Sequence, residues 1–295
     1  MHPCHFFKAR SRLGIINLPL YGTDYNVGVE HGPDAVLDEG FLRSLPLSCP
    51  VHSIDYSLPE QTGKAKYRET IAHAASAFAD FITGNLAPGE TQVVVGGDHS
   101  VAFGSVLAVL KRFPADEIAY FHFDSHSDQS LFSDSLTGNF HGLFARVLFD
   151  PHFDDPQINA LIPVKIPTAN AWVFGDLEAD DYDFIRSSGM KSTTSEQLSS
   201  EAKRLHEQLQ RFILPFRHIH VSFDIDVFTR TLAPATGTPA LIGFTRAQIM
   251  PLLTILRDHP SCSYDLVEVN PQKPGSAETI SLAQDVLRTM LEVGL

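Results

Sequence analysis

The stretch Ile118-Ala119-Tyr120-Phe121-His122-Phe123-Asp124-Ser125-His126-Ser127-Asp128 joins a largely apolar run to a cluster of ionisable side chains. Its first half has the length and composition of a buried strand. In its second half, Asp124, His126 and Asp128 are spaced by two, so an extended chain presents them on one face. Three ionisable groups at the end of a buried strand need partners or a metal ion to offset their desolvation. This stretch therefore predicts a metal site at the carboxyl end of a strand.

Two other segments end in the same kind of side chain. Asp224 and Asp226 follow the run 218–223, and His99 follows the apolar run 93–95 and two glycines. Taken alone, an Asp-x-Asp at a strand end is more often a loop cap than a metal site. Together the segments offer carboxylates and imidazoles without thiolates, a ligand set that suits Mn²⁺ and, less exclusively, Fe, Co, Ni or Zn. We expect two ions, which can share a hydroxide whose formation they promote at neutral pH.

Short apolar runs alternate with longer helical patterns along the chain. Apolar runs joined by helices indicate a parallel sheet covered on both faces. The expected strands span residues 13–18, 91–95, 117–123, 171–174, 218–223 and 264–269, and the expected helices span 64–83, 100–112, 196–212, 245–257 and 278–291. We expect one domain over residues 1–295, with His2 and His5 near the terminus in a frayed tail. In such a sheet the site lies beyond the carboxyl ends of the strands, where the ligand-type residues and Glu268 fall.

Composition argues against nucleic acid and membranes as partners. The net charge is −13, from 22 basic and 35 acidic residues, and the basic residues form no stripe. No apolar run is long enough to span a bilayer, and the first residues lack the apolar core of a signal peptide. Cys4, Cys49 and Cys262 are odd in number and far apart, which predicts three reduced thiols in a cytoplasmic protein. The acidity suits a cationic substrate, although it is also common among cytosolic enzymes.

In combination, the motifs resemble the ureohydrolases, the family of arginase, agmatinase and formimidoylglutamase. The resemblance is carried by Gly96-Gly97-Asp98-His99-Ser100, Asp124-Ser125-His126-Ser127-Asp128, Ser222-Phe223-Asp224-Ile225-Asp226, Thr236-Gly237-Thr238-Pro239 and Glu268-Val269-Asn270-Pro271. It implies an α/β protein with a three-layer α/β/α fold and a mainly parallel sheet of about eight strands. It also implies a homo-oligomer, commonly a trimer or a hexamer.

The resemblance further implies two Mn²⁺ ions and a set of ligands for them. One ion would be held by His99, Asp124, Asp128 and Asp224, and the other by Asp124, His126, Asp224 and Asp226. A hydroxide that bridges the ions would attack the guanidinium carbon of the substrate, with Asp128 assisting proton movement. Glu268 would pair with the guanidinium group, and His141 would protonate the leaving amine. Without the resemblance, His141 is more simply a loop histidine.

Three further histidines lie beside these ligands in the sequence. His122, His218 and His220 share a strand face with them. We interpret all three as core residues with hydrogen-bond partners, or as residues that orient the ligands from behind.

Loops decide the substrate within this family. Residues 137–142 resemble the arginase version, in which Thr137 and Asn139 hold an α-carboxylate. Asp180 lines up loosely with the acid that meets the α-amino group, although Asp181 or Asp183 fits a shifted alignment. The implied substrate is a small cationic guanidino compound, most simply L-arginine, which is hydrolysed to urea and an amine.

Departures from the family pattern leave the substrate open. Ser125 replaces the usual Ala between two ligands, a change that keeps their geometry. Gln129-Ser130 stands where an arginase offers an Asn to the carboxylate. Agmatinase, guanidinobutyrase and formimidoylglutamase activities are therefore alternatives. More distant alternatives are a non-catalytic metal-binding regulatory homologue, and a deacetylase with one Zn²⁺ and a nearby Tyr.

Overall fold

The computed structural model describes residues 3–15, 26–46, 49–56, 68–177 and 182–291. In this part of the chain, eight strands form one sheet in the order β2-β1-β3-β8-β7-β4-β5-β6, and every neighbouring pair is parallel. The strands are β1 (Cys4–Arg10), β2 (Val51–Asp55), β3 (Thr91–Gly96), β4 (Ile118–Phe123), β5 (Ala171–Phe174), β6 (Lys191–Thr193), β7 (His218–Asp224) and β8 (Cys262–Val267). The predicted parallel sheet of about eight strands is confirmed.

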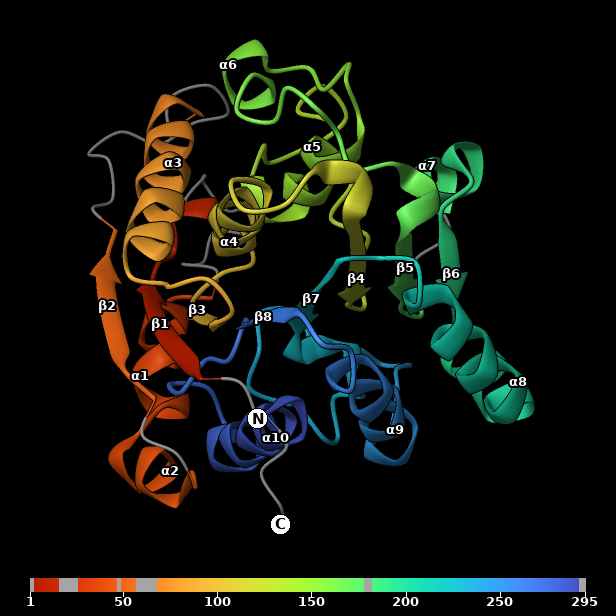
Figure 1. Ribbon diagram of the computed structural model, residues 1–295. Coiled ribbons are helices and arrows are strands. Elements are labelled where there is room, and N and C mark those ends of the chain that lie inside the picture. Colours follow the sequence, from red (N-terminus) through yellow and green to blue (C-terminus); the bar gives the residue numbers. More distant parts are fainter. Residues whose placement is uncertain (1–2, 16–25, 47–48, 57–67, 178–181, 292–295) are drawn as a thin grey trace.

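Helices cover both faces of this sheet (Figure 1). One layer contains α3 (Arg68–Gly84), α4 (Val101–Leu110), α5 (Phe144–Phe149), α6 (Pro156–Asn159) and α7 (Tyr182–Ser188), and the other contains α1 (Gly32–Val36), α2 (Glu39–Ser44), α8 (Ser195–Ile213), α9 (Arg246–Arg257) and α10 (Ser276–Met290). A hydrophobic core lies on each side of the sheet. Successive residues of β4 enter opposite cores, Tyr120 the first and Phe121 the second. The three-layer α/β/α architecture is confirmed.

The middle of the sheet positions the candidate site. Strands β3, β8, β7 and β4 are neighbours, so their carboxyl ends meet along one short edge. Strands β4 and β7 are buried along their whole length. The side chains that follow these strands are therefore held by the most rigid part of the fold.

The amino-terminal segment corrects the sequence analysis. Residues 4–10 form β1, an interior strand between β2 and β3, and not a frayed tail. Phe6 and Phe7 point to opposite faces and are fully buried. Two cations make this strand look polar in the sequence, but both pair with one acid: Lys8 Nζ lies 3.0 Å and Arg10 Nε 2.5 Å from the carboxylate of Asp34.

The strand predicted over residues 13–18 is wrong where it is described, because Leu13–Ile15 forms a 3-10 helix. Residues 16–18 lie outside the described part of the chain. Strands β2 and β6 are missing from the prediction, because both are short edge strands that leave much of their surface exposed. The other predicted strands and helices agree with the structure to within a few residues over their described parts.

The cysteines also correct the sequence analysis. Cys4 and Cys49 form a disulfide, with their Cα atoms 5.5 Å apart, so the prediction of three reduced thiols is wrong. The two residues are 45 positions apart in sequence. They meet because β1 and β2 are paired and the N–H of Phe6 donates to the carbonyl of Pro50 at 2.9 Å. Cys262 is free and half-buried, and burial raises the pKa of its thiol to about 12.

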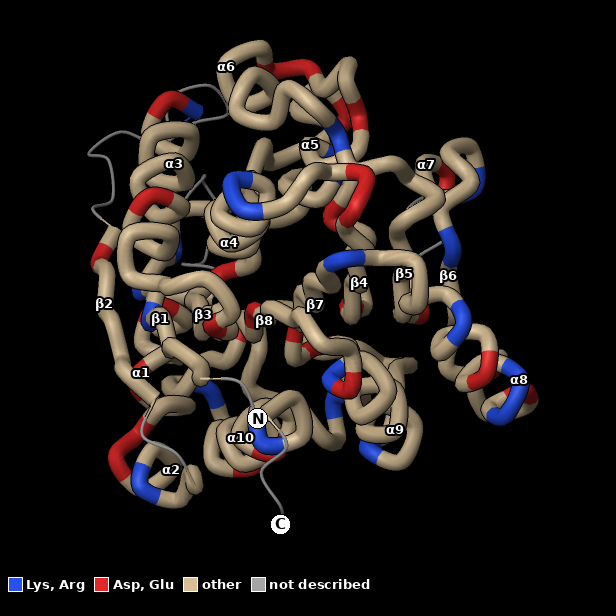
Figure 2. Tube along the Cα trace, viewed as in Figure 1, with Lys and Arg blue, Asp and Glu red and all other residues tan. Residues whose placement is uncertain are grey.

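The described helices give no membrane-crossing segment, since none of them is both long and apolar enough to traverse a bilayer. In the view of Figure 2, Lys and Arg are scattered over the helices of both layers and do not gather along one face. The sequence-based prediction against nucleic-acid partners stays a prediction.

The disulfide makes a direct prediction about stability. Cys49→Ser should lower the free energy of unfolding by about 2–4 kcal/mol, because the bond restricts the unfolded chain. Urea unfolding of oxidised protein measures the loss, with Cys262→Ser as the matched control that should leave the disulfide contribution unchanged. Thiol titration of the unfolded wild-type protein should find one free thiol; three free thiols would contradict the pairing.

Candidate metal centre and active site

The predicted ligand residues meet at the carboxyl edge of the central strands. His99 follows β3, Asp124 to Asp128 follow β4, and Asp224 ends β7, with Asp226 in the 3-10 helix Ile225–Val227. Each carboxylate among them is at most 8% exposed. The structure therefore brings together six side chains from three segments that the sequence places far apart.

One group of ligand atoms surrounds His99. Its Nδ1 lies 2.9 Å from Asp124 Oδ2, 2.9 Å from Asp128 Oδ2 and 3.5 Å from Asp224 Oδ2. His122 joins this group, because its Nε2 lies 3.2 Å from Asp124 Oδ2. One atom from each of His99, His122, Asp124 and Asp128 fits within 4.8 Å of the others.

A second group adjoins the first through Asp124. His126 Nδ1 lies 3.3 Å from Asp124 Oδ1 and 3.1 Å from Asp226 Oδ2, and these three residues again offer atoms within 4.8 Å of one another. Asp124 belongs to both groups and offers a different oxygen to each. This is the arrangement expected of a carboxylate shared by two neighbouring cations.

Unpaired buried atoms show that the groups suit a cation. His99 Nδ1, His122 Nε2 and Asp124 Oδ2 are buried without a hydrogen bond, although they lie close together. Buried polar atoms without partners are costly, and carboxylate oxygens with imidazole nitrogens are ligands for divalent ions such as Mn²⁺. The residues present therefore fit a divalent metal ion, and their chemistry does not distinguish Mn²⁺ from other borderline ions.

The electrostatics of the acids point the same way. Burial, together with the neighbouring charges of Asp226 and Asp124, raises the pKa of Asp224 well above its ordinary value. Burial also opposes the ionisation of Asp124, but the imidazoles of His122, His126 and His99 outweigh it and hold the pKa of Asp124 well below its ordinary value. Crowded carboxylates of this kind gain most from a bound cation.

The backbone is strained at the same place. Among the described residues other than glycine, three have positive φ angles: Asn26 (52°), Asp128 (52°) and Glu268 (67°). Such conformations are unfavourable for residues with a Cβ atom and concentrate at functional sites. Here two of the three carry side chains that face the cleft.

Glu268 follows β8 and lies beside the metal groups, within hydrogen-bonding reach of two segments. Its Oε2 accepts a hydrogen bond from Asn26 Nδ2 at 2.6 Å, and its Oε1 accepts from the backbone N–H of His99 at 2.9 Å. His141, in the 3-10 helix Phe140–Gly142, places Nδ1 3.7 Å from Glu268 Oε1. The carboxylate is thereby fixed in direction, with an imidazole at its side.

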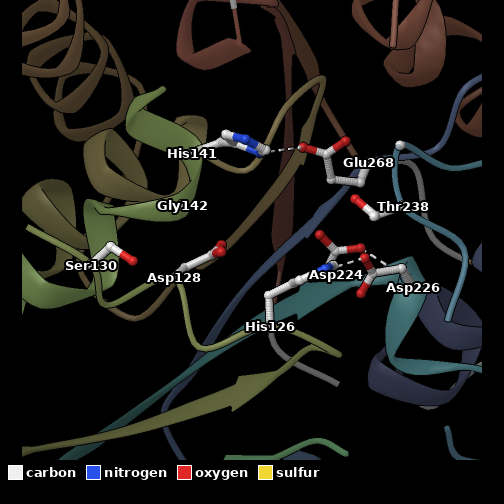
Figure 3. A pocket seen from close by; sticks show the side chains of 10 residues that line it. His126, Asp128, Ser130, His141, Gly142, Asp224, Asp226, Thr238 and Glu268 are labelled. Carbon is white, nitrogen blue, oxygen red and sulfur yellow. Dashed lines mark hydrogen bonds and ion pairs between the residues drawn. The ribbon is translucent and has the colours of Figure 1, made fainter. Parts of the chain in front are cut away.

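A cleft of about 200 Å³ opens between these residues. Its lining comprises His126, Asp128, Ser130, His141, Gly142, Asp224, Asp226, Gly237, Thr238 and Glu268. Figure 3 shows Glu268 and His141 on one side of the cleft, facing the acids of the metal groups. The described lining contains four carboxylates and neither Lys nor Arg, so the cleft suits a cationic ligand.

The predicted specificity residues are placed less clearly. Thr137 and Asn139 precede His141 in the same loop, but neither belongs to the cleft lining, and Asn139 is buried. Asp180 and Asp181 lie outside the described residues. Asp183 lies on α7, where it is exposed and 4.0 Å from Arg186.

Three residues that support the ligands are missing from the sequence-based prediction. They are Asn26, which binds Glu268, Ser222, which binds His99, and Asp265, which binds Ser222. A signal existed for the last two, since polar residues alternate along β7 and β8 inside otherwise apolar strands. The signal for Asn26 was absent, because its contact joins residues 242 positions apart.

Both the sequence and the fold are similar to those of known hydrolases. The sequence model of one protein family, described as the Arginase family, matches residues 11–292. "Arginase-2, mitochondrial" of Rattus norvegicus is 27% identical, over 97% of this chain and 86% of that protein. The structure of Entamoeba histolytica arginase in complex with L-ornithine matches this fold with a TM-score of 0.85 at 20% sequence identity. The match covers 99% of this chain and 98% of the Entamoeba histolytica chain. The structure of proclavaminate amidino hydrolase from Streptomyces clavuligerus matches with a TM-score of 0.70 at 22% sequence identity. This match covers 100% of this chain and 93% of the Streptomyces clavuligerus chain.

The shared position of Asp124 predicts how metal binding fails. Asp124→Ala should abolish binding of both ions, because the residue offers one oxygen to each group. The test is to incubate the protein with Mn²⁺, desalt it, and measure the bound manganese by inductively coupled plasma mass spectrometry. Glu207→Ala, on the exposed face of α8, is the control. A variant that keeps one tightly bound ion would contradict the shared role.

Glu268 predicts the protonation of His141 in the metal-free protein. Burial lowers the pKa of His141, but the Glu268 carboxylate 3.7 Å away and the nearby charges of Asp128 and Asp98 outweigh it, and the net shift is upward. Glu268→Gln removes the charge and leaves the burial, so the pKa of His141 should fall. Titration of the imidazole signals by NMR measures the change, with Glu278→Gln as a remote control; an unchanged or higher pKa would contradict the coupling.

Proposed function

Because the chain belongs to the arginase family, hydrolases that act on amidino carbon–nitrogen bonds, we propose that it hydrolyses L-arginine to urea and an amine, using two Mn²⁺ ions. The observation that carries this proposal is the position of Glu268. Its carboxylate is held across an acidic cleft from two adjoining groups of metal-type ligands. A guanidinium group between them would meet a carboxylate on one side and the hydrolytic centre on the other.

The proposed metal ligands are the six residues given by the sequence resemblance. His99, Asp128 and His126 would each bind one ion, Asp124 and Asp224 would bind both, and Asp226 would complete the second site. Two bound divalent ions would supply a water activated for attack at neutral pH. The protein's own side chains would then orient the substrate and move protons.

Glu268 orients the substrate in this proposal. A guanidinium is planar and donates hydrogen bonds in a fork that matches a carboxylate. Both Glu268 oxygens already accept one hydrogen bond, from Asn26 and from the His99 backbone, so the group cannot rotate away from the cleft. Because the Glu268 carboxylate is already held in place, it would position the guanidinium carbon without a further loss of Glu268 side-chain entropy.

His141 is the proposed proton donor to the leaving amine. It lines the cleft beside Glu268, and its side chain is about one quarter exposed. The raised pKa increases the protonated fraction at neutral pH. Asp128 lines the opposite side and is the proposed carrier of the proton released by the attacking water.

The other end of the substrate is less constrained. Thr137, Asn139 and Asp180 are proposed to bind the α-carboxylate and α-amino group, following the sequence resemblance. Gln129-Ser130 stands where an arginase offers an Asn, and Ser130 lines the cleft. This substitution favours a second candidate, hydrolysis of agmatine, which has no carboxylate, or of guanidinobutyrate or formimidoylglutamate, whose carboxylates are placed differently from that of arginine.

Other properties follow from the sequence alone and stay predictions. They are a single domain over residues 1–295, a trimer or hexamer, and a cytoplasmic location. The disulfide removes the cysteine argument for the last of these.

The decisive experiment compares four substrates with the Mn²⁺-loaded protein. Arginine, agmatine, 4-guanidinobutyrate and N-formimidoylglutamate are offered side by side, and urea and formamide are measured. We expect arginine to be turned over best. Glu268→Gln should keep its metal content while kcat/KM falls about 10- to 150-fold, the equivalent of the roughly 1.5–3 kcal/mol of a hydrogen bond to a charged group.

Asn139→Ala serves as the specificity control. It should weaken turnover of arginine far more than that of agmatine, which has no α-carboxylate. Equal effects on both would contradict the carboxylate role of Asn139. Turnover of a different compound would replace arginine as the substrate, and silence on all four with two metals bound would contradict the catalytic proposal itself.

A further inference from the structure

A stripe of polar side chains runs through the core beneath the metal groups. On β7 it contains His218, His220 and Ser222, and on β8 it contains Ser263 and Asp265. The parallel register pairs His220 with Ser263 and Ser222 with Asp265. All five residues are at most 1% exposed, so their polar atoms depend on one another for hydrogen bonds.

Hydrogen bonds join this stripe to His99. The Nε2 of His99 lies 2.9 Å from Ser222 Oγ, and Ser222 Oγ donates to Asp265 Oδ1 at 2.6 Å. The second oxygen of Asp265, Oδ2, lies 2.7 Å from His220 Nε2. The carboxylate of Asp265 therefore stands in the middle of a continuous buried chain.

Asp265 determines which atom donates in each of these bonds. Burial opposes its ionisation, but hydrogen bonds from His220 and Ser222 outweigh this, and the pKa of Asp265 is lowered. An ionised carboxylate only accepts hydrogen bonds. Ser222 therefore gives its single O–H to Asp265, and towards His99 it can only accept. The hydrogen in the bond between His99 and Ser222 must belong to His99 Nε2.

We propose that Asp265 is a positioning residue for the metal centre: through Ser222 it holds His99 with Nε2–H turned away from the site and Nδ1 presented to a cation. This Nδ1 is the atom that lies 2.9 Å from both Asp124 and Asp128 and has no hydrogen bond of its own. The inference rests on the proposed metal role of His99 and is independent of the substrate.

Packing supports the same orientation. The ring of His99 lies parallel to that of His122, with centroids 5.2 Å apart and an interplanar angle of 2°, and it contacts Phe144 at 4.6 Å. Tilting the ring out of this plane would lose these contacts together with the bond to Ser222. The orientation is thus built into the core and does not depend on a bound ligand.

Beyond Asp265, the series of hydrogen bonds continues to two more buried histidines, His220 and His218, and this explains why the core tolerates them. His220 Nε2 lies 2.7 Å from Asp265 Oδ2, and its Nδ1 lies 2.8 Å from Ser263 Oγ. Ser263 Oγ also lies 2.7 Å from His218 Nε2, and His218 Nδ1 lies 2.8 Å from Ser261 Oγ. Burial and neighbouring positive charges lower the pKa of His218 well below its ordinary value, which keeps it neutral.

Metal affinity in the absence of substrate tests the proposal. Ser222→Ala removes the acceptor for His99 Nε2–H, and Asp265→Asn removes the group that obliges Ser222 to accept. Titration calorimetry of the metal-free proteins with Mn²⁺, and separately with Zn²⁺, should show affinity about 10- to 100-fold weaker in Ser222→Ala. Asp265→Asn should also bind more weakly than wild type. Ser105→Ala is the matched control, since Ser105 is a buried serine bonded to Gln92 away from the site and its loss should leave affinity unchanged.

A spectroscopic readout separates positioning from a general loss of stability. In Zn²⁺-loaded protein labelled with ¹⁵N-histidine, wild type should show a slowly exchanging His99 Nε2–H, and Ser222→Ala should lose it while the other imidazole signals remain. Wild-type affinity in Ser222→Ala would overturn the proposal. Weak binding in Ser222→Ala with wild-type binding in Asp265→Asn would overturn the role of Asp265, and so would a wild-type protein that binds neither ion. None of these results depends on which compound is hydrolysed.

Discussion

Asp124 contacts both groups of ligand atoms, and the cost of burying its charge governs the rest of the site. The residue is fully buried, and His99, His122 and His126 face it from three sides. A buried charge is tolerated only when its partners are held in good geometry. Among the described residues, one imidazole, that of His99, lies within ion-pair distance of the neighbouring Asp224, whose pKa is raised by burial and by the charges of Asp226 and Asp124. The site therefore combines one well-compensated carboxylate with others that need a cation.

Compensation of this kind requires support from segments that look unrelated to the site. The end of β1 is an example: Ala9 and Ser11 accept hydrogen bonds from the backbone of Gly97 and Asp98, just before His99. A Cβ atom on Gly97 would lie 1.8 Å from the carbonyl of Ser11, so this close approach requires glycine. Gly97 in turn accepts from the N–H of Glu268 at 2.8 Å. The amino-terminal strand thus fixes both a metal ligand and the proposed guanidinium partner.

The sequence predicts those parts of the molecule whose signal is local. Asp124, His126 and Asp128 stand at period two after an apolar strand, and that pattern alone indicates a buried ionisable cluster. The disulfide between Cys4 and Cys49 and the bond between Asn26 and Glu268 were not predictable in this way, because both depend on which distant strands become neighbours. The same holds for Ser222 and Asp265, whose pairing is a matter of register between β7 and β8.

The metal-type ligands can be predicted from the sequence more closely than the residues that select the substrate, because the former follow strands of the sheet and the latter lie in loops. The metal-type ligands and Glu268 follow strands that are packed against a hydrophobic core on both faces. A shift of one ligand would therefore disturb the packing of the sheet. Ser130 and Thr238 reach the same cleft from connecting loops, where substitutions cost little stability. The reacting half of the cleft is therefore constrained by folding, whereas the half that meets the rest of the substrate is free to vary. For that reason the metal-type ligands follow from the fold of the sheet, whereas the loops can vary in what they bind without disturbing it.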